Sequence, residues 1–588
     1  MKKNRRFRTI LFTLLGLITL IISADIVLSK LAVRKLKSGL ASAGITAGSV
    51  HADLVTRSIT LHDFRWQVES TDSISYDGGM VPSTSLALDF SAETIQASWI
   101  SIISFIRNHQ LHLGSLKVLR GKIVADRQKL EQMQATVDQH KEFDADKPLP
   151  FRQLNIGSIA LENFDITIRY DSITEHKANV SLILDEVILN DMKRLKEVDA
   201  WSVANVKANL RGYQMSAKPY LYTMNVEEVD LDTRSKTMTA QGIGLLPRYG
   251  KYKFSRRLGK QIDRFVLRVP KLEIAGLDMS QIRDSIITAS SLRITNANLH
   301  VFRDKRLPFI KHHNTPLPMA LIRKMAFGFA LDSLSLVDAR ITYEEFPEKG
   351  FRTGYIVFDR LNAQITSLTN RDFYPGLKKS VLQVTSRVMQ NGGIKVDFTI
   401  PYDKAQVYNA TGRIYNLRLA SLNPILESLA FVKIESGRLN SLDFNFDYDE
   451  YTSRGNILVN YENLKMAGLT KDKESKENNV KSLALNVFVR KDKDREVPIQ
   501  KRSGKVFYER DRRRAVFNVW VKSLFSGVKS SVVDPPAERK PQTRKEKRDS
   551  LRQFRKDNRE RKKKERQEER NEKRNEASDT VTVISSQQ

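Results

Sequence analysis

The feature that most constrains this 588-residue chain is a pattern of alternation that slips by one position. In residues 59–68 two apolar side chains alternate with polar ones, a polar residue takes the next inward position, and the alternation restarts one residue later. Period-two alternation indicates a strand with one buried face, and a slip would reverse that face unless a bulge absorbs the extra residue. The pattern therefore predicts bent, half-buried strands.

The same frame occurs five times at irregular spacing, which indicates a degenerate repeat. The residues at the slip are Asp63, Arg120, Asn163, Asn296 and Asp338. Asp, Asn and Gly at or beside a slip tolerate the positive φ that a bulge requires. The predicted inward residues are Ile59, Leu61, Phe64, Trp66, Leu116, Val118, Ile159, Leu161, Ile166, Ile168, Leu292, Ile294, Leu334, Leu336 and Ile341.

Helices are expected to be few and short. Two copies of the pattern share a longer order of strand, short helix and strand, with the helices predicted at 99–107 and 279–287. A more polar surface helix is predicted at 127–142. The proline-punctuated segment 304–320 is predicted to connect two β-rich regions, which cover 29–303 and 321–533.

The first 28 residues predict where the rest of the chain lies. Residues 1–8 hold five basic side chains and precede an uncharged apolar run. An anchor helix over 9–28 would be about 30 Å long, enough to cross a bilayer. The positive-inside rule leaves 1–8 in the cytoplasm and exports the remainder. A cleaved signal peptide is the alternative, and both interpretations export the body.

The absence of cysteine excludes disulfides, thiolate metal sites and cysteine nucleophiles. His109 and His112, like His312 and His313, have no acidic residue at a ligand spacing, so no metal site is predicted. No glycine-rich phosphate loop and no Gly-x-Ser-x-Gly elbow occurs. We therefore nominate no catalytic residue and no cofactor, and the chain is not expected to be an enzyme.

The formal net charge of +30 extends beyond the C-terminal region, because 538–576 holds 18 basic and 10 acidic residues, a net of +8. Residues 534–588 have almost no apolar side chains and are predicted to form a disordered basic tail. Export excludes nucleic acid as its partner, which leaves anionic headgroups or lipopolysaccharide phosphates. A solvated tail with self-paired charges is the alternative. The densest cluster is Arg559, Arg561, Lys562, Lys563, Lys564 and Arg566.

Three segments carry a resemblance to a known family. They are 50–64, with Val-His-Ala-Asp-Leu and Ser-Ile-Thr-Leu-His-Asp-Phe; 98–123; and 412–461, with Leu-Arg-Leu-Ala-Ser-Leu-Asn-Pro-Ile-Leu. Over residues 1–533 the chain resembles the AsmA-like bacterial envelope proteins, which are relatives of TamB and of bridge-like lipid transfer proteins. The basic tail departs from the family pattern.

The resemblance implies an anchor in the bacterial inner membrane and an elongated, curled antiparallel β-sheet in the periplasm. It also implies an apolar inner groove that shelters phospholipid acyl chains during outer-membrane biogenesis or maintenance. The residues themselves indicate many half-buried strands and few helices to cover them, which fits an open groove or a closed sandwich. A periplasmic scaffold or adaptor without lipid cargo is the alternative function. Its protein partners are not specified by the sequence.

Overall fold

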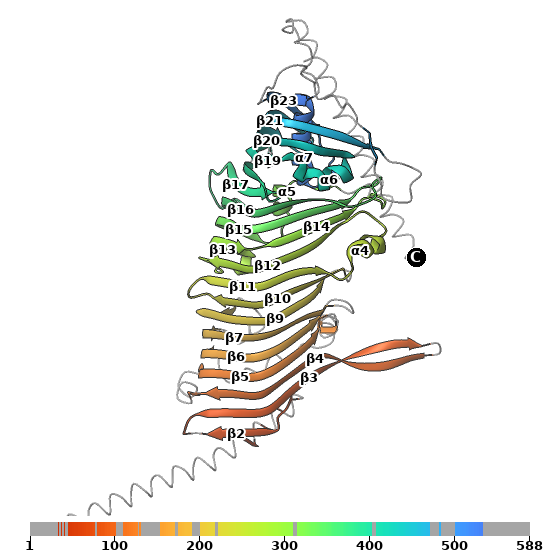
Figure 1. Ribbon diagram of the computed structural model, residues 1–588. Helices are drawn as coiled ribbons and strands as arrows, with labels where there is room; N and C mark the ends of the chain where they lie inside the picture. The colour runs from red at the N-terminus through yellow and green to blue at the C-terminus, as the bar shows by residue number, and fades with distance from the viewer. Residues whose placement is uncertain are drawn as a thin grey trace, which may run out of the picture. The chain divides into compact units, whose positions relative to one another are not determined.

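The computed structural model describes residues 33–34, 37, 40, 45–53, 55–76, 79–101, 110–127, 129–130, 153–170, 175–190, 200–217, 221–309, 314–402, 407–470, 481–483 and 500–532. The protein is mainly β, and its strands form one long curled sheet of 23 strands (Figure 1), which confirms the predicted fold class at this level. The predicted anchor 9–28 with its flank 1–8, and the tail 534–588, lie outside the described residues. Within the described ranges, no helix has the length and apolar character needed to cross a bilayer.

The strands follow the chain closely. The first group is β1 (Ile45–Thr46), β2 (Ser49–Asp53), β3 (Ser58–Tyr76), β4 (Gly79–Ser98), β5 (Gln110–Asp126), β6 (Gln153–Arg169), β7 (Glu175–Leu189) and β8 (Trp201–Ser202). The middle group is β9 (Asn205–Ala217), β10 (Tyr222–Asp232), β11 (Thr237–Pro247), β12 (Asp263–Ala275), β13 (Ile286–Thr295), β14 (Asn298–Asp304), β15 (Gly328–Phe346) and β16 (Gly354–Thr369). The last group is β17 (Lys379–Val388), β18 (Gly392–Pro401), β19 (Tyr408–Arg418), β20 (Val432–Tyr448), β21 (Thr452–Thr470), β22 (Lys481–Leu483) and β23 (Gln500–Glu509).

Most neighbouring strands pair antiparallel, but two junctions are parallel. β5 pairs with β6 in parallel, and β13 and β14 both pair with β15 in parallel. The expectation of a purely antiparallel sheet is therefore wrong at these junctions. Each junction needs a long crossover, because parallel neighbours cannot be joined by a hairpin. The second crossover contains the predicted connection 304–320, and the sheet continues across it.

The structure confirms the predicted backbone at every slip. Positive φ values occur at Asp63 (52°), Arg120 (48°), Asn163 (57°), Asn296 (56°) and Asp338 (52°). Local hydrogen bonds hold two of these bulges, since the Asn163 N–H donates to Ser181 Oγ at 3.2 Å and the Asp338 N–H donates to Asn362 Oδ1 at 3.1 Å. Each strand therefore keeps one apolar face on both sides of its slip.

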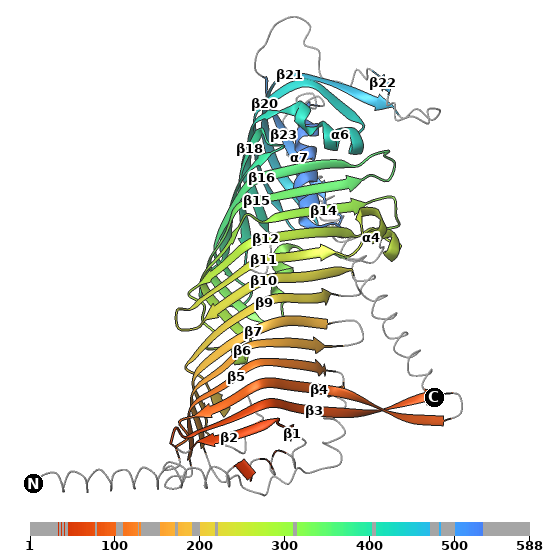
Figure 2. The ribbon, with the colours of Figure 1, turned by 60° about the horizontal axis from the view of Figure 1, so that its bottom comes forward.

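The bulges of neighbouring strands lie beside one another. The register places Asp63 of β3 and Arg120 of β5 on either side of Glu93 in β4. Asn296, between β13 and β14, donates its N–H to the carbonyl of Val337, directly before Asp338. Because a bulge bends its strand, a line of bulges bends the whole sheet. Figure 2 shows strands that curve part-way along their length.

The helices differ more from expectation than the strands do. The segment 279–287 holds only the 3₁₀ turn η3 (Ile282–Asp284), so the longer helix predicted there is wrong. Residues 102–109 and most of 127–142 lie outside the described residues, although positions 127, 129 and 130 are helical. The remaining helical elements are α4 (Lys251–Leu258), α5 (Pro318–Arg323), η4 (Leu419–Leu422), α6 (Asn423–Leu429) and α7 (Val516–Val532).

Candidate functional site

One face of the sheet carries an unbroken row of apolar residues, called the apolar row below; this face is the inner face. Residues directly opposite in the register of paired strands point to the same face. Followed from β2 to β23, the register joins Val50, Leu61, Ile95, Val118, Leu161, Leu182, Ala208, Leu231, Met238, Ile274, Leu292, Leu334, Ile365, Leu382, Phe398, Ala410, Phe446, Gly455 and Val506. No charged or hydrogen-bonding side chain interrupts it.

A second apolar row runs beside the first. From Phe164 the register joins Val180, Leu210, Val229, Ala240, Leu272, Ile294, Leu336, Ala363, Val384 and Val396. From β7 to β18 the residues of the two rows are two positions apart in each strand and so point to the same face, while in β6 the slip at Asn163 lies between Leu161 and Phe164. The inner face is therefore at least two side chains wide from β6 to β18.

The structure brings the predicted inward residues to this face. Leu61, Phe64 and Val118 are buried, with Ile59, Leu161 and Ile166 packed against them. Ile294, Leu336 and Ile341 pack in a second cluster around Ala297 and Ala339. Half-buried positions are held by Leu116, Ile159, Ile168, Leu292 and Leu334, and Trp66 is 38% exposed. Whether these side chains contact lipid stays a prediction.

Cover over the apolar row differs along the sheet. Near β3 and β5 the helical residues Val33 and Leu40 pack on the inner face. Each residue of the apolar row is called a rung below. In the middle of the sheet five rungs are only half-buried, namely Leu182, Ala208, Leu231, Met238 and Ile274. At the far end Ala410, Phe446 and Val506 are 0%, 1% and 3% exposed. The middle of the row is thus its most accessible part.

Helix α7 covers the far end of the row. The Trp520 ring stacks on Phe398 with centroids 4.3 Å apart, and Val519 is fully buried. Gly527 lies so close that an added Cβ would be 2.9 Å from Ile457 Cγ2 and 3.0 Å from Val506 Cγ2. Glycine therefore permits the close approach of α7 to β21 and β23.

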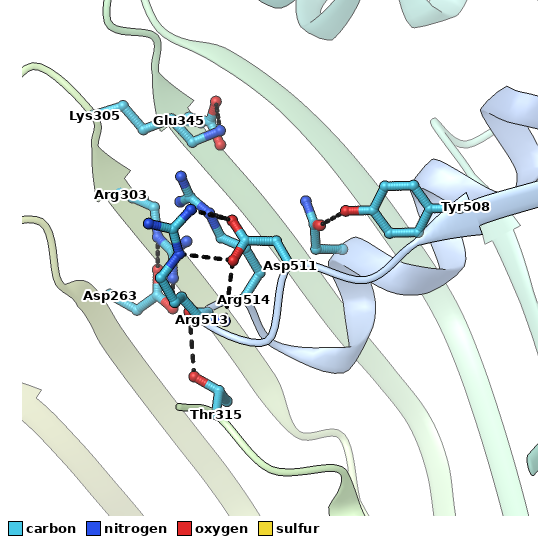
Figure 3. Close-up of polar contacts among 10 residues, drawn as sticks. Asp263, Arg303, Lys305, Thr315, Glu345, Tyr508, Asp511, Arg513 and Arg514 are labelled. Carbon is cyan, nitrogen blue, oxygen red and sulfur yellow. Dashed lines mark hydrogen bonds and ion pairs between the residues drawn. The ribbon is translucent and has the colours of Figure 1, made fainter. Parts of the chain in front are cut away.

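A polar cluster, the clamp, lies where the segment before α7 meets β12, β14 and β15 (Figure 3). Arg303 donates to Asp263 at 2.6 Å and 2.5 Å, and Lys305 lies 2.7 Å from Glu345. Burial raises the pKa of the Tyr343 hydroxyl well above its ordinary value, and this hydroxyl donates to Glu345 Oε2 at 2.5 Å. Lys305 and Tyr343 thus provide polar partners for the buried carboxylate of Glu345.

The other side of the clamp belongs to the segment that leads into α7. Asp511 accepts hydrogen bonds from Arg513, which lower the pKa of Asp511, and its carboxylate is 3.6 Å from Arg514. The Thr315 hydroxyl donates to the carbonyl of Arg513, and Arg510 pairs with Glu450. The clamp thus ties the segment before α7 to the connection 304–320 and to the turn between β20 and β21.

Among the described residues, no group of three or more His, Asp or Glu side chains is arranged so that it could hold a metal ion. His112 lies 3.2 Å from both Gln110 and Asn155, while His109, His312 and His313 are outside the described residues. The tail cluster at 559–566 is also outside them. Comparison of the sequence with models of known protein families and with curated proteins finds no match in either set.

Proposed function

We propose that this protein handles phospholipid passively in the bacterial envelope. It would be anchored in the inner membrane through 9–28, with its sheet in the periplasm, as the resemblance to AsmA-like proteins implies. The observation that carries the proposal is the apolar row, which continues from β2 to β23 and is half-buried in its middle. An apolar row whose middle residues are only half-buried favours a ligand over solvent.

The length of the row suits more than one lipid. At about 4.8 Å per strand, the row has a contour of about 85 Å, nearly three times the roughly 30 Å thickness of a bilayer core. Each methylene group that leaves water for the row gains about 0.8 kcal/mol. Acyl chains would lie on the inner face while the headgroups stay in water, and movement along the row would exchange one apolar rung for the next.

The test is recovery of lipid from the full-length protein. We expect the protein, purified in a mild detergent and extracted with organic solvent, to release phospholipid that mass spectrometry identifies. A soluble protein without an apolar inner face, purified beside it, controls for carry-over. If phospholipid is no more abundant than in that control, the proposal fails and the scaffold alternative takes its place.

A further inference from the structure

The apolar row does not end where α7 begins to cover it. Phe398, Ala410 and Phe446 continue the register of Leu292 and Leu334 on the same face of the sheet. Over these end rungs α7 takes the position that acyl chains would take over the middle rungs. The end rungs are therefore chemically a continuation of the same binding surface.

We propose that α7 is a displaceable cap and that the end rungs beneath it form a second acyl-chain site. The inference rests on the proposed function and names a further segment of the same surface. When α7 moves aside, cargo reaches β18 to β23; when α7 is seated, cargo is confined to the strands before it.

The attachment of α7 fits a cap that is tethered at one end. The surface of the sheet that α7 packs against is called its seat below. In the middle of this seat, the hydroxyl oxygens of Ser523 and of Ser453 in β21 are 2.5 Å apart, and both side chains are fully buried. A neutral hydrogen bond stabilises less than an apolar contact of the same area would, because its partners lose hydrogen bonds to water. Acyl chains can bury the apolar rungs from water, as α7 does. The clamp at Asp511 and Arg510 would hold the start of the helix during this exchange.

On its other side α7 exposes a large apolar residue. Phe525 is 54% exposed and lies two residues, about half a helical turn, from the buried positions Ser523 and Gly527. A helix with apolar side chains on two faces is not confined to a single seat, because either face gains by burial. Phe525 thus provides a surface through which a displaced α7 could still contact acyl chains.

The lack of native cysteine permits a direct test. The hydroxyl oxygens of Ser453 and Ser523 are 2.5 Å apart, a separation close to the S–S bond length of about 2.05 Å. The double variant S453C/S523C should therefore form a disulfide that locks α7 to β21. The reduced form of the same molecule is its matched control. The probe is a phospholipid with a photoreactive group near the end of one acyl chain, offered to the full-length protein, with labelled peptides mapped by mass spectrometry.

We expect β9 to β12 to be labelled in every state. Labelling of β18 to β20 should occur in the wild type and the reduced variant, and fall at least about tenfold on oxidation. If labelling of β18 to β20 is unchanged by oxidation, or is absent in every state, the cap proposal is overturned. Labelling of β9 to β12 in the same experiment would still support the proposed function. Absence of labelling in the middle overturns the proposed function itself. A second variant, V519A, weakens the seat and should raise end labelling several-fold over wild type; no increase also overturns the cap.

Discussion

At the residue scale, the fold depends on side chains that tolerate a left-handed backbone. Asn163 has φ 57° in the interior of β6, and left-handed conformations cost most residues about 1–2 kcal/mol. We expect N163V to destabilise the protein by about that amount, because a β-branched residue is least tolerant of positive φ. N163G should stay within about 0.5 kcal/mol of the wild type. Thermal unfolding of the two variants measures this difference, and equal melting temperatures would contradict it.

The close contact beneath Phe164 gives a second prediction. An added Cβ at Gly121 would be 2.0 Å from Phe164 Cζ, and the Phe164 side chain is 1% exposed, so neither group can easily move. We expect G121A to destabilise the protein by about 1–3 kcal/mol through overpacking. Gly250 has open space where its Cβ would lie, so G250A is the matched control and should have little effect. The second substitution F164L should partly restore the melting temperature of G121A.

At the scale of the strand, local sequence predicts the bulges well and long-range pairing poorly. The sequence indicates the slip frame at five places, and the structure has further left-handed residues at the same point of the alternation. These are Glu186, Gly212, Gly242, Arg360, Asn416 and Asn463. Glu186 and Arg360 were missed because neither type favours a left-handed backbone and neither is followed by a glycine, as Arg120 is. The two glycines were missed although apolar alternation on both sides of each gives the signal.

The parallel junctions could not be predicted, because alternation fixes the face of a strand and not its neighbour. Helix α7 was also missed, although apolar residues such as Val516, Trp520 and Leu524 recur at the helical period of 3.6 and provide the signal. The face of the candidate site could be predicted residue by residue. The continuity of the apolar row follows only from the register of the folded sheet.

Adjacent residues of β7 provide a test of the inner face. Leu182 is a half-buried rung of the apolar row, while Ile183 points to the opposite face and is 38% exposed. We expect L182N to lower the amount of co-purified phospholipid, because a polar amide interrupts the row. I183N introduces the same amide on the other face and should leave lipid recovery unchanged. Equal loss from both variants would show that lipid does not depend on the inner face.

At the scale of the whole molecule, the proposal requires the body to lie outside the cytoplasm. The basic residues of 1–8 and the apolar run after them predict export of everything C-terminal to the anchor. We expect a reporter that is active only in the periplasm to be active when fused after Gln588. A reporter that works only in the cytoplasm serves as the reciprocal control. Activity of that second fusion would contradict the topology and, with it, the proposed function.

The basic tail is expected to act on an anionic surface without contributing to the sheet. Truncation after Val533 keeps every described strand and α7, so the melting temperature should not change. Binding of the protein to vesicles with anionic lipid should weaken, since basic residues contribute up to about 1 kcal/mol each near such a surface. The tail's contribution should fade as salt shortens the Debye length from about 10 Å at 0.1 M to about 3 Å at 1 M. Vesicles of neutral lipid are the control. Binding that ignores salt, or that is equal on neutral vesicles, would point instead to a specific protein partner for the tail.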